Sequence, residues 1–192
     1  MNTPPPPLRA PARMPSGLNW KRFVDLNAEE SEKVLHWRNH PQVRKWMVNQ
    51  EPISEHEHSA FLERLRQGDD PDYYLLFFQQ QAFGVVDFYR KSSNPHSCYY
   101  GYYLDPCRLG SAMGILLEFW VAEYALTHWQ YHHIVAETRT DNTAARELHA
   151  HFGFSVMGTN SRELEEAVLH ADTWKQRRKP VLSEIARFFC RP

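Results

Sequence analysis

The stretch YYGYYLDPCRLGSAMGILLEFW, residues 99–120, runs from a string of aromatic residues through a turn of small residues into a long apolar block. Aromatic residues favour a strand, and the apolar block after Ser111 favours a helix. Pro106 cannot donate a hydrogen bond to a neighbouring strand, and Gly110 permits a close approach or a positive φ angle. The first turn of the helix would present backbone N–H groups and the positive end of the helix dipole, which suits a phosphate. An ordinary strand-to-helix turn has the same features, and the turn in isolation favours that simpler interpretation.

The composition narrows the class of protein. The chain has 192 residues, of which 42% are hydrophobic, and a formal net charge of −1. This length supports one buried core, and the charge gives no reason to expect nucleic acid or an anionic membrane as a partner. The three cysteines show neither CxxC pairing nor the spacing of a disulfide framework, and the N-terminus has no long apolar segment. We therefore expect a cytoplasmic protein without a signal peptide or a membrane span.

The first 19 residues differ from the rest, because they hold six of the thirteen prolines. Proline disfavours helices and removes backbone donors, so we expect residues 1–19 to form a disordered tail. The remainder, residues 20–192, is expected to form a single domain.

Capping signals and periodicity predict the order of the helices and strands. Asn27 and Ser54 stand at the expected N-caps of two helices, and Glu57 completes a capping box in the second of them. The predicted helices cover 27–40, 41–47, 54–68, 111–128 and 142–152. The predicted strands cover 22–26, 72–79, 82–90, 97–105, 132–139 and 153–159. This order indicates a mixed α/β (α+β) fold with a mostly antiparallel sheet flanked by helices.

Two segments carry a family resemblance. The acetyl-CoA-binding half of the GNAT acetyltransferase superfamily resembles residues 132–154, HHIVAETRTDNTAARELHAHFGF. The R/Q-x-x-G-x-G/A pyrophosphate loop of that family resembles the turn CRLGSAMG, with Gly110 and Ala112 on the small positions and Cys107 in place of Arg or Gln. The resemblance implies a GNAT-like fold over residues 22–158 and acetyl-CoA as the acyl donor. The tail after Gly158 matches the family poorly.

The resemblance also implies which residues bind acetyl-CoA. They lie at the end of the aromatic strand, on the turn and at the start of the later helix: Leu104, Arg108, Leu109, Gly110, Ser111, Ala112, Met113, Gly114, Asn142 and Ala145. In this family a splayed strand holds the thioester, and Gly101 together with Pro106 would loosen that strand here.

Two residues are implied in the chemistry. His149 stands where the family usually has Tyr, and an imidazole with a pKa near ~6.5 can protonate the leaving thiolate. Helical periodicity puts His149 and His151 on opposite margins of an apolar stripe, so only the resemblance selects His149; a half-buried surface histidine is the alternative. Glu137 is the candidate general base, with a solvated carboxylate at a strand end, or deprotonation through water, as alternatives.

The N-terminal segment HWRNHPQVRKWM, residues 36–47, resembles a narrower group, the enzymes that N-acetylate a UDP-linked 4-amino-dideoxy sugar in pseudaminic acid biosynthesis. Protein N-terminal acetyltransferases of the ribosomal type have a looser version of it. The implied substrate-binding residues are Trp37, Arg38, Asn39, Arg44 and Trp46. Guanidinium groups bind a diphosphate with forked geometry, and an indole can stack on a uracil, although core packing is the simpler interpretation of both indoles.

Together these features predict an N-acetyltransferase that moves an acetyl group from acetyl-CoA to the amine of a UDP-4-amino-4,6-dideoxy sugar, by direct attack in a ternary complex. A protein or peptide N-terminal amine is the alternative acceptor, and a catalytically silent CoA-binding domain is a further alternative. The eleven histidines show no HExxH spacing and have no thiolate near them, so no metal is expected. The resemblance allows a homodimer, and neither nucleic acid nor a membrane is expected as a partner.

Overall fold

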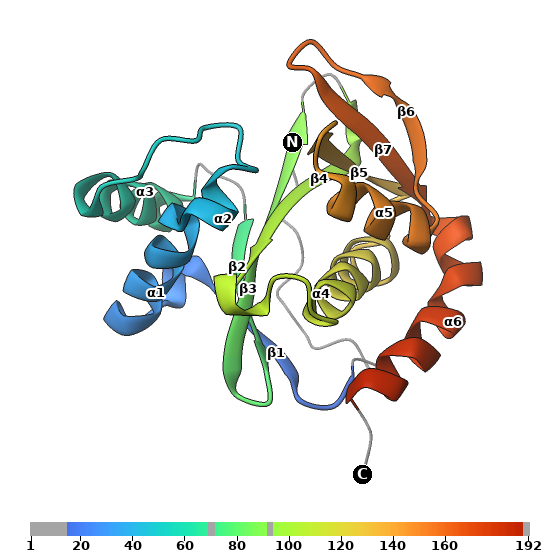
Figure 1. Ribbon diagram of the computed structural model, residues 1–192, viewed down its shortest axis with the longest axis horizontal. Helices are drawn as coiled ribbons and strands as arrows, with labels where there is room; N and C mark the ends of the chain where they lie inside the picture. Colours follow the sequence, from blue (N-terminus) through green and yellow to red (C-terminus); the bar gives the residue numbers. More distant parts are fainter. Residues whose placement is uncertain (1–14, 69–71, 92–93, 190–192) are drawn as a thin grey trace. The chain divides into compact units, whose positions relative to one another are not determined.

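The computed structural model describes residues 15–68, 72–91 and 94–189, and Figure 1 shows how the elements follow one another. Contacts divide the chain into two compact units. The N-terminal unit contains Gly17–Arg90 and Tyr100–Gly114, and the C-terminal unit contains Lys91–Tyr99 and the chain from Ile115 onward. The prediction of one domain over 20–192 stays a prediction. Most of the predicted tail, residues 1–14, lies outside the described residues.

The N-terminal unit is a sheet with helices on it. Its strands, in the spatial order β1-β2-β3-β4, are β1 (Leu18–Arg22), β2 (Asp72–Phe78), β3 (Gln81–Lys91) and the second half of β4 (Asn94–Leu104). Its helices are the 3₁₀ turn η1 (Phe23–Asp25), α1 (Ala28–Asn39), α2 (Pro41–Arg44), α3 (Glu55–Gln67) and the 3₁₀ turn η2 (Pro106–Arg108). The strands predicted at 72–79 and 82–90 are confirmed and form a hairpin, because β2 and β3 pair antiparallel. Its turn residues Gln79 and Gln80 both have positive φ angles, 49° and 66°, which match the twist of a tight hairpin.

The first strand lies earlier in the chain than predicted. The strand expected at 22–26 is found at Leu18–Arg22, and Phe23–Asp25 forms a 3₁₀ turn instead. All five residues of β1 pair with β2, from Leu18 opposite Phe78 to Arg22 opposite Tyr74. Leu18 is 5% exposed and belongs to β1. The folded chain therefore begins before residue 20, within the range predicted for the tail.

The helix boundaries of this unit follow the predicted caps. The Asn27 side chain accepts a hydrogen bond from the backbone N–H of Glu30 at 2.9 Å, and Ser54 with Glu57 forms the second capping box. Helices α1 and α3 then cover one face of the hairpin, as Figure 1 shows beside β2 and β3. The buried core between them consists of Phe23, Val34, Trp37, Leu62, Leu65, Leu75 and Val85.

The C-terminal unit begins with the first half of β4. The other strands are β5 (His133–Arg139), β6 (Ser155–Thr159) and β7 (Leu164–His170), in the spatial order β4-β5-β7-β6, and β7 pairs antiparallel with both β5 and β6. The helices are α4 (Met113–Ala122), the π-helical segment η3 (Glu123–His128), α5 (Thr143–Phe152) and α6 (Ala171–Phe189). The helix expected at 111–128 therefore changes its winding at Glu123. The predicted mostly antiparallel sheet flanked by helices is confirmed.

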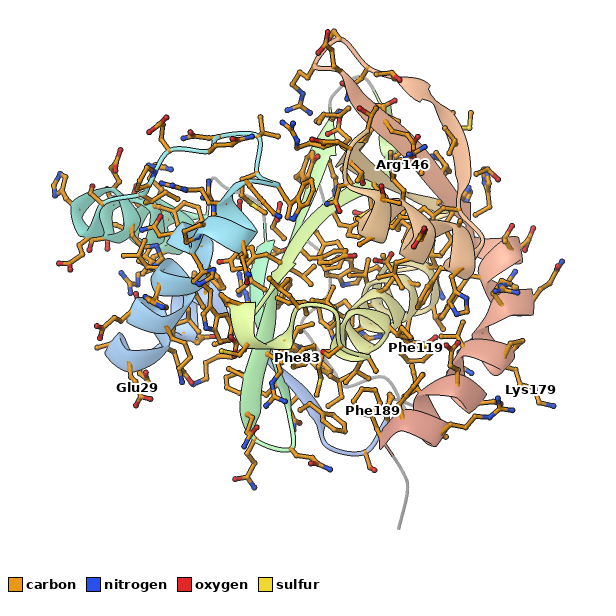
Figure 2. The ribbon with its side chains drawn as sticks, viewed as in Figure 1. Glu29, Phe83, Phe119, Arg146, Lys179 and Phe189 are labelled. Carbon is orange, nitrogen blue, oxygen red and sulfur yellow. The ribbon has the colours of Figure 1, made fainter. Side chains whose placement is uncertain are left out.

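The interior of the C-terminal unit is aromatic and includes the tail that matched the family poorly. Trp174 of α6 lies with its ring centroid 5.5 Å from that of Phe119 and 6.0 Å from that of Phe152. Figure 2 shows Phe119 among the side chains inside this unit and Lys179 pointing away from α6 into solvent. None of the helices in the described part of the chain is both long enough and apolar enough to span a bilayer.

Candidate active site

The turn before α4 has the conformation that the small residues predicted. Asp105 accepts a hydrogen bond from the Cys107 N–H at 2.9 Å, which starts η2, and Gly110 has a φ angle of 73°. Ser111 caps α4, because its hydroxyl accepts from the Met113 N–H at 3.3 Å and donates to the Arg108 carbonyl at 2.5 Å. The Gly110 side of the turn is open, since a Cβ atom placed there would meet nothing within 4 Å.

Fewer backbone N–H groups are bare in this turn than the sequence suggested. The N–H groups of Leu109, Ser111 and Gly114 donate to carbonyls of the turn itself. Those of Gly110 and Ala112 have no acceptor among the residues that the structure describes. These two donors, at the start of a helix with its positive dipole end, are the ones available to a pyrophosphate.

Filling this turn should therefore weaken acetyl-CoA binding. Ala112→Glu puts a carboxylate beside the two bare donors, and we expect calorimetry to show an acetyl-CoA Kd at least about tenfold higher, which corresponds to about 1.4 kcal/mol. Gly110→Val is a poorer test, because the left-handed backbone strains any side chain. Ala150→Glu, an equal change on an exposed position of α5, is the matched control. Wild-type affinity in Ala112→Glu would remove the turn from the acetyl-CoA site.

The other predicted acetyl-CoA residues vary in accessibility. Leu104 is 7% exposed and Leu109 is 40% exposed. Arg108 donates to the side-chain oxygen of Gln81 at 2.8 Å. In the C-terminal unit, Asn142 is the N-cap of α5 and its side-chain oxygen accepts from the Ala145 N–H at 3.3 Å. The cap explains why these two residues occur together, and their part in acetyl-CoA binding stays a prediction.

His149 is buried, although periodicity placed it on the margin of the apolar stripe and a half-buried surface position was the alternative. It is 4% exposed, its ring centroid lies 5.0 Å from that of Phe154, and its Nε2 lies 3.9 Å from a carboxylate oxygen of Glu118. Burial lowers the pKa of His149 to about 4, and the Glu165 carboxylate opposes this shift. His151 is exposed instead and pairs with Glu184 at 2.7 Å.

The low pKa sets a condition on the acid role of His149. At neutral pH its imidazole carries no charge. The imidazole must therefore take up a proton before it can give one to the sulfur. We expect this only as negative charge develops on the leaving sulfur, since a nearby anion favours the protonated imidazole. The acid role stays a prediction with this requirement attached.

Glu137 is held by other side chains. Its carboxylate, 4% exposed, lies 2.7 Å from Lys91 Nζ and 2.7 Å from Arg162 Nη2, and it also accepts from the Asn160 amide. A carboxylate engaged by two cations has little tendency to bind a proton. These contacts tie β5 to Lys91 at the end of β3 and to the segment between β6 and β7. They give no support to the base role of Glu137, which stays a prediction.

The five predicted acceptor residues separate into three kinds. Trp37 is 5% exposed in the core of the N-terminal unit, so its predicted stacking on a uracil is corrected to core packing. The Asn39 side chain holds both the carbonyl and the N–H of Ile53, at 2.7 and 2.8 Å. Arg38, Arg44 and Trp46 stay partly exposed, and the Lys45 ammonium lies 4.7 Å from the Trp46 ring centroid.

Arg38 is the most informative of these residues. Its Nη2 donates to the Asn49 carbonyl at 2.6 Å, whereas its buried Nη1 has no acceptor within the described residues. Burial lowers the pKa of Arg38, and the nearby Arg44 lowers it further, while Tyr103 opposes both effects. A second cation beside a half-buried guanidinium with a spare donor is an arrangement that an anion would stabilise.

Asp87 was missed by the sequence-based prediction. It lies on β3, opposite Tyr73 of β2, in the strand segment AFGVVDFYR. Burial raises its pKa to about 7, against a hydrogen bond from its own backbone N–H. A lone carboxyl between apolar strand residues was the signal that could have found it.

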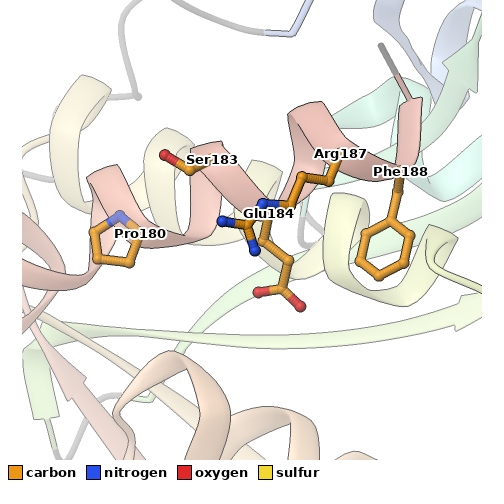
Figure 3. Close-up of a pocket in the computed structure, with 5 residues that line it drawn as sticks. All are labelled: Pro180, Ser183, Glu184, Arg187 and Phe188. Atoms are coloured by element: carbon orange, nitrogen blue, oxygen red, sulfur yellow. The ribbon is translucent and has the colours of Figure 1, made fainter. Parts of the chain in front are cut away.

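Within the part of the chain that the structure describes, neither a metal site nor a surface groove contributes to the candidate active site. Among the described residues, no group of three or more His, Cys, Asp and Glu side chains is placed to hold a metal ion. A groove on α6 is lined by Pro180, Ser183, Glu184, Arg187 and Phe188, as Figure 3 shows. None of the predicted acetyl-CoA or acceptor residues lines that groove, so it receives no role in the reaction.

Comparison with known proteins finds a matching family and a related curated protein. Residues 22–155 match the model of a family described as an acetyltransferase (GNAT) domain. Acetyltransferase PseH of Campylobacter jejuni (subsp. jejuni serotype O:23/36, strain 81-176) is 32% identical over 136 residues, which cover 71% of this chain and 83% of that protein.

Solved structures extend the likeness to three dimensions. The crystal structure of the Campylobacter jejuni N-acetyltransferase PseH in complex with acetyl coenzyme A has a TM-score of 0.63 at 25% identity, over 80% of this chain and 98% of that one. The spermidine N-acetyltransferase from Vibrio cholerae, in complex with CoA and spermine, has a TM-score of 0.70 at 15% identity, over 84% and 99% of the two chains. At that identity the second likeness concerns the fold alone.

Proposed function

Because the chain belongs to the GNAT acetyltransferase family, we propose that it is a cytoplasmic enzyme that acetylates the amine of a UDP-linked 4-amino-4,6-dideoxy sugar. Membership of the family makes the chain an acetyl-CoA-dependent N-acetyltransferase. The proposal therefore concerns the acceptor and the residues that recognise it.

The observation that carries the proposal is the state of Arg38. Its free Nη1, its proximity to Arg44 and its lowered pKa describe a cationic site that favours an anion. A nucleotide diphosphate supplies such an anion, and guanidinium groups bind it through forked hydrogen bonds. The half-exposed indole of Trp46 offers a surface on which a uracil could stack. The relationship to acetyltransferase PseH supports the same choice, as does the sequence resemblance to the sugar enzymes.

The reaction follows from the chemistry of a thioester and an amine. The acceptor ammonium first loses a proton, and its nitrogen then attacks the thioester carbon directly in the ternary complex. A carbon–nitrogen bond forms and the carbon–sulfur bond breaks; the nitrogen loses its second proton as the amide forms, and the leaving thiolate of CoA takes up a proton. The chain must supply a base for the ammonium and an acid for the thiolate; His149 is our candidate for the acid.

Arg38→Ala tests the acceptor assignment. We expect the acceptor KM to rise by about 10–100-fold, because a charge-assisted hydrogen bond of about 1.5–3 kcal/mol is lost, while the acetyl-CoA Kd stays at the wild-type value. Arg44→Ala should act in the same direction. Arg64→Ala on α3, an arginine whose guanidinium carbon lies 5.8 Å from the Phe61 ring centroid, is the matched control.

Two outcomes would contradict this assignment. If Arg38→Ala loses acetyl-CoA binding, the segment serves the acetyl donor or the fold. If Arg38→Ala raises the KM equally for a peptide amine and for the UDP-sugar, the guanidinium does not read the diphosphate, and the N-terminal acetyltransferase alternative gains.

A further inference from the structure

We propose that Asp87 is the general base that takes a proton from the acceptor ammonium, so that the free amine can attack acetyl-CoA. This inference rests on the proposed function, because it assumes an amine acceptor in the N-terminal unit beside Arg38. It assigns the proton transfer that Glu137, held by two cations, is poorly suited to perform.

The strand register places Asp87 on the face of the sheet that α1 and α3 cover. Asp87 lies opposite Tyr73, and two residues earlier on β3 Val85 lies opposite Leu75, in the core with those helices. Side chains two apart on a strand share a face, so Asp87 continues the row of Val85 where the apolar core ends. Tyr103 belongs to the same face, since it packs against that core and its hydroxyl lies 3.4 Å from the Val34 carbonyl of α1.

A glycine makes room for the carboxyl group. A Cβ atom on Gly101 of β4 would lie 2.9 Å from Asp87 Oδ1, closer than real Cβ contacts. The sequence suggested that Gly101 loosens its strand. The structure shows a different reason for a glycine at this position, since any side chain there would displace the carboxyl group of Asp87.

The charged and titratable groups around Asp87 come from five elements. Tyr73 of β2 and Tyr103 of β4 lie beside it, and Arg38 of α1 lies near Tyr103, with Arg44 of α2 next to Arg38. Helix α3 packs on the same face, and its buried titratable group is His58, whose Nε2 lies 3.1 Å from the Ser31 hydroxyl of α1. Burial raises the pKa of Tyr103, so this phenol stays protonated at neutral pH.

These surroundings suit proton transfer from an amine. Burial raises the pKa of Asp87 to about 7, and a general base works best when its pKa lies near the working pH. The ammonium loses one proton to the carboxylate, which becomes the neutral acid. The free electron pair on nitrogen forms the carbon–nitrogen bond as the carbon–sulfur bond breaks. The nitrogen then gives up its second proton, which balances the proton that the leaving thiolate takes up, and the proton on Asp87 returns to solvent.

Asp87→Asn is the first variant in the test. We expect kcat to fall by about 10²–10⁴, with an unchanged acetyl-CoA Kd. The kcat/KM profile of the wild type should rise with pH through a limb near 7, which the variant should lose. Asp87→Glu should keep the limb and part of the rate. Asp72→Asn, which removes an ion pair of 3.4 Å with Arg22 on the same hairpin, is the matched control.

The Tm of Asp87→Asn distinguishes a catalytic role of Asp87 from a structural one, because the two roles predict changes of opposite sign. The pKa of Asp87 is raised from 3.8 to about 7 on folding, so the folded state keeps a proton that the unfolded state loses, and stability falls as the pH rises between these values. Asp87→Asn should therefore have a Tm at pH 8 equal to or above that of the wild type while it loses activity. A lower Tm together with lost activity would assign Asp87 to the fold.

Gly101→Ala keeps the carboxyl and moves it. The added methyl group meets the far end of a side chain, which can shift, so the variant should fold, with a lower kcat and a retained but displaced pH limb. Wild-type kcat together with an intact limb in Asp87→Asn would overturn the proposal.

The test also separates this proposal from the acceptor assignment. If the wild type acetylates a peptide amine and not the UDP-sugar, the proposed function fails and the same variants are measured on the peptide. If no acceptor is turned over, ¹³C NMR titration of the Asp87 carboxyl in the free protein decides. A midpoint near 7 supports the proposal, and a midpoint near the ordinary value of 3.8 overturns it.

Discussion

Replacing His149 with alanine is expected to lower kcat by about 10²–10⁴, with little change in acetyl-CoA affinity, if this side chain protonates the leaving thiolate. His149 is 4% exposed and its pKa is lowered to about 4, so the free enzyme holds a neutral imidazole at neutral pH. No limb of the kcat profile near 6.5 should then belong to His149. Stopped-flow and steady-state kinetics with acetyl-CoA and the sugar acceptor measure the loss.

Shape-matched variants separate proton transfer from packing. His149→Phe keeps a ring against Phe154 and should lose as much kcat as His149→Ala, whereas His149→Tyr should recover part of the rate. His151→Ala removes an exposed ion pair with Glu184 and should be close to neutral. If His149→Phe turns over at the wild-type rate, the histidine is a core residue and not the acid.

The pH dependence of stability provides an independent check on the burial of His149. The pKa is lowered from 6.5 to about 4 on folding, so the unfolded state binds a proton first, and stability is lost as the pH falls through this range. The loss for this one group is about 3 kcal/mol. Thermal unfolding of His149→Phe should accordingly show a weaker decline between pH 6.5 and pH 4 than the wild type does.

Arg178→Ala is expected to destabilise the fold by about 3–5 kcal/mol, because it leaves a buried carboxylate without its cation. Glu123 is 2% exposed, and Arg178 holds both of its oxygens, at 2.7 and 2.8 Å, while the Trp174 indole donates to one of them at 3.3 Å. For a chain of this size the Tm should fall by roughly 10 °C in differential scanning calorimetry.

A double variant tests whether the unpaired charge causes this loss. Glu123→Leu combined with Arg178→Met removes both charges and should recover most of the stability, since well-packed apolar groups can replace a buried ion pair. Lys175→Ala, which breaks an exposed pair with Asp172 on the same helix, should change the Tm very little. If Arg178→Ala behaves like Lys175→Ala, the buried pair does not hold α6 in place.

Local signals were sufficient for the elements that depend on a few neighbouring residues. Asn27 and Ser54 cap their helices as predicted, because a cap is decided by hydrogen bonds within one turn. The Gly110 turn has the predicted positive φ angle for the same reason. The first strand was misplaced because its five residues are selected by pairing with β2, a partner more than fifty residues away.

Tertiary contacts decided what the sequence could not. Periodicity placed His149 on the margin of an apolar stripe, whereas in the fold it is 4% exposed and its Nε2 lies 3.9 Å from Glu118 of α4. Trp37 was predicted to bind the acceptor, but its side chain lies in the core of the N-terminal unit. The tail after residue 158 forms β7 and α6, whose Trp174 completes an aromatic interior that no local pattern specifies. Burial raises the pKa of Asp87, and Gly101 leaves space for its carboxyl group. Both effects arise only in the folded chain, where Asp87 lies two residues after the core residue Val85.

A direct competition between amines measures which acceptor the protein prefers. The wild-type protein is incubated with acetyl-CoA and an equimolar mixture of a UDP-4-amino-4,6-dideoxy sugar, spermidine and a peptide with a free N-terminus, and the products are quantified by mass spectrometry. We predict one added acetyl group on the sugar amine, with a kcat/KM at least about 10²-fold above those of the other two amines. Acetylation of the peptide or of spermidine at an equal or higher kcat/KM would contradict the assignment of the UDP-linked amino sugar as the acceptor.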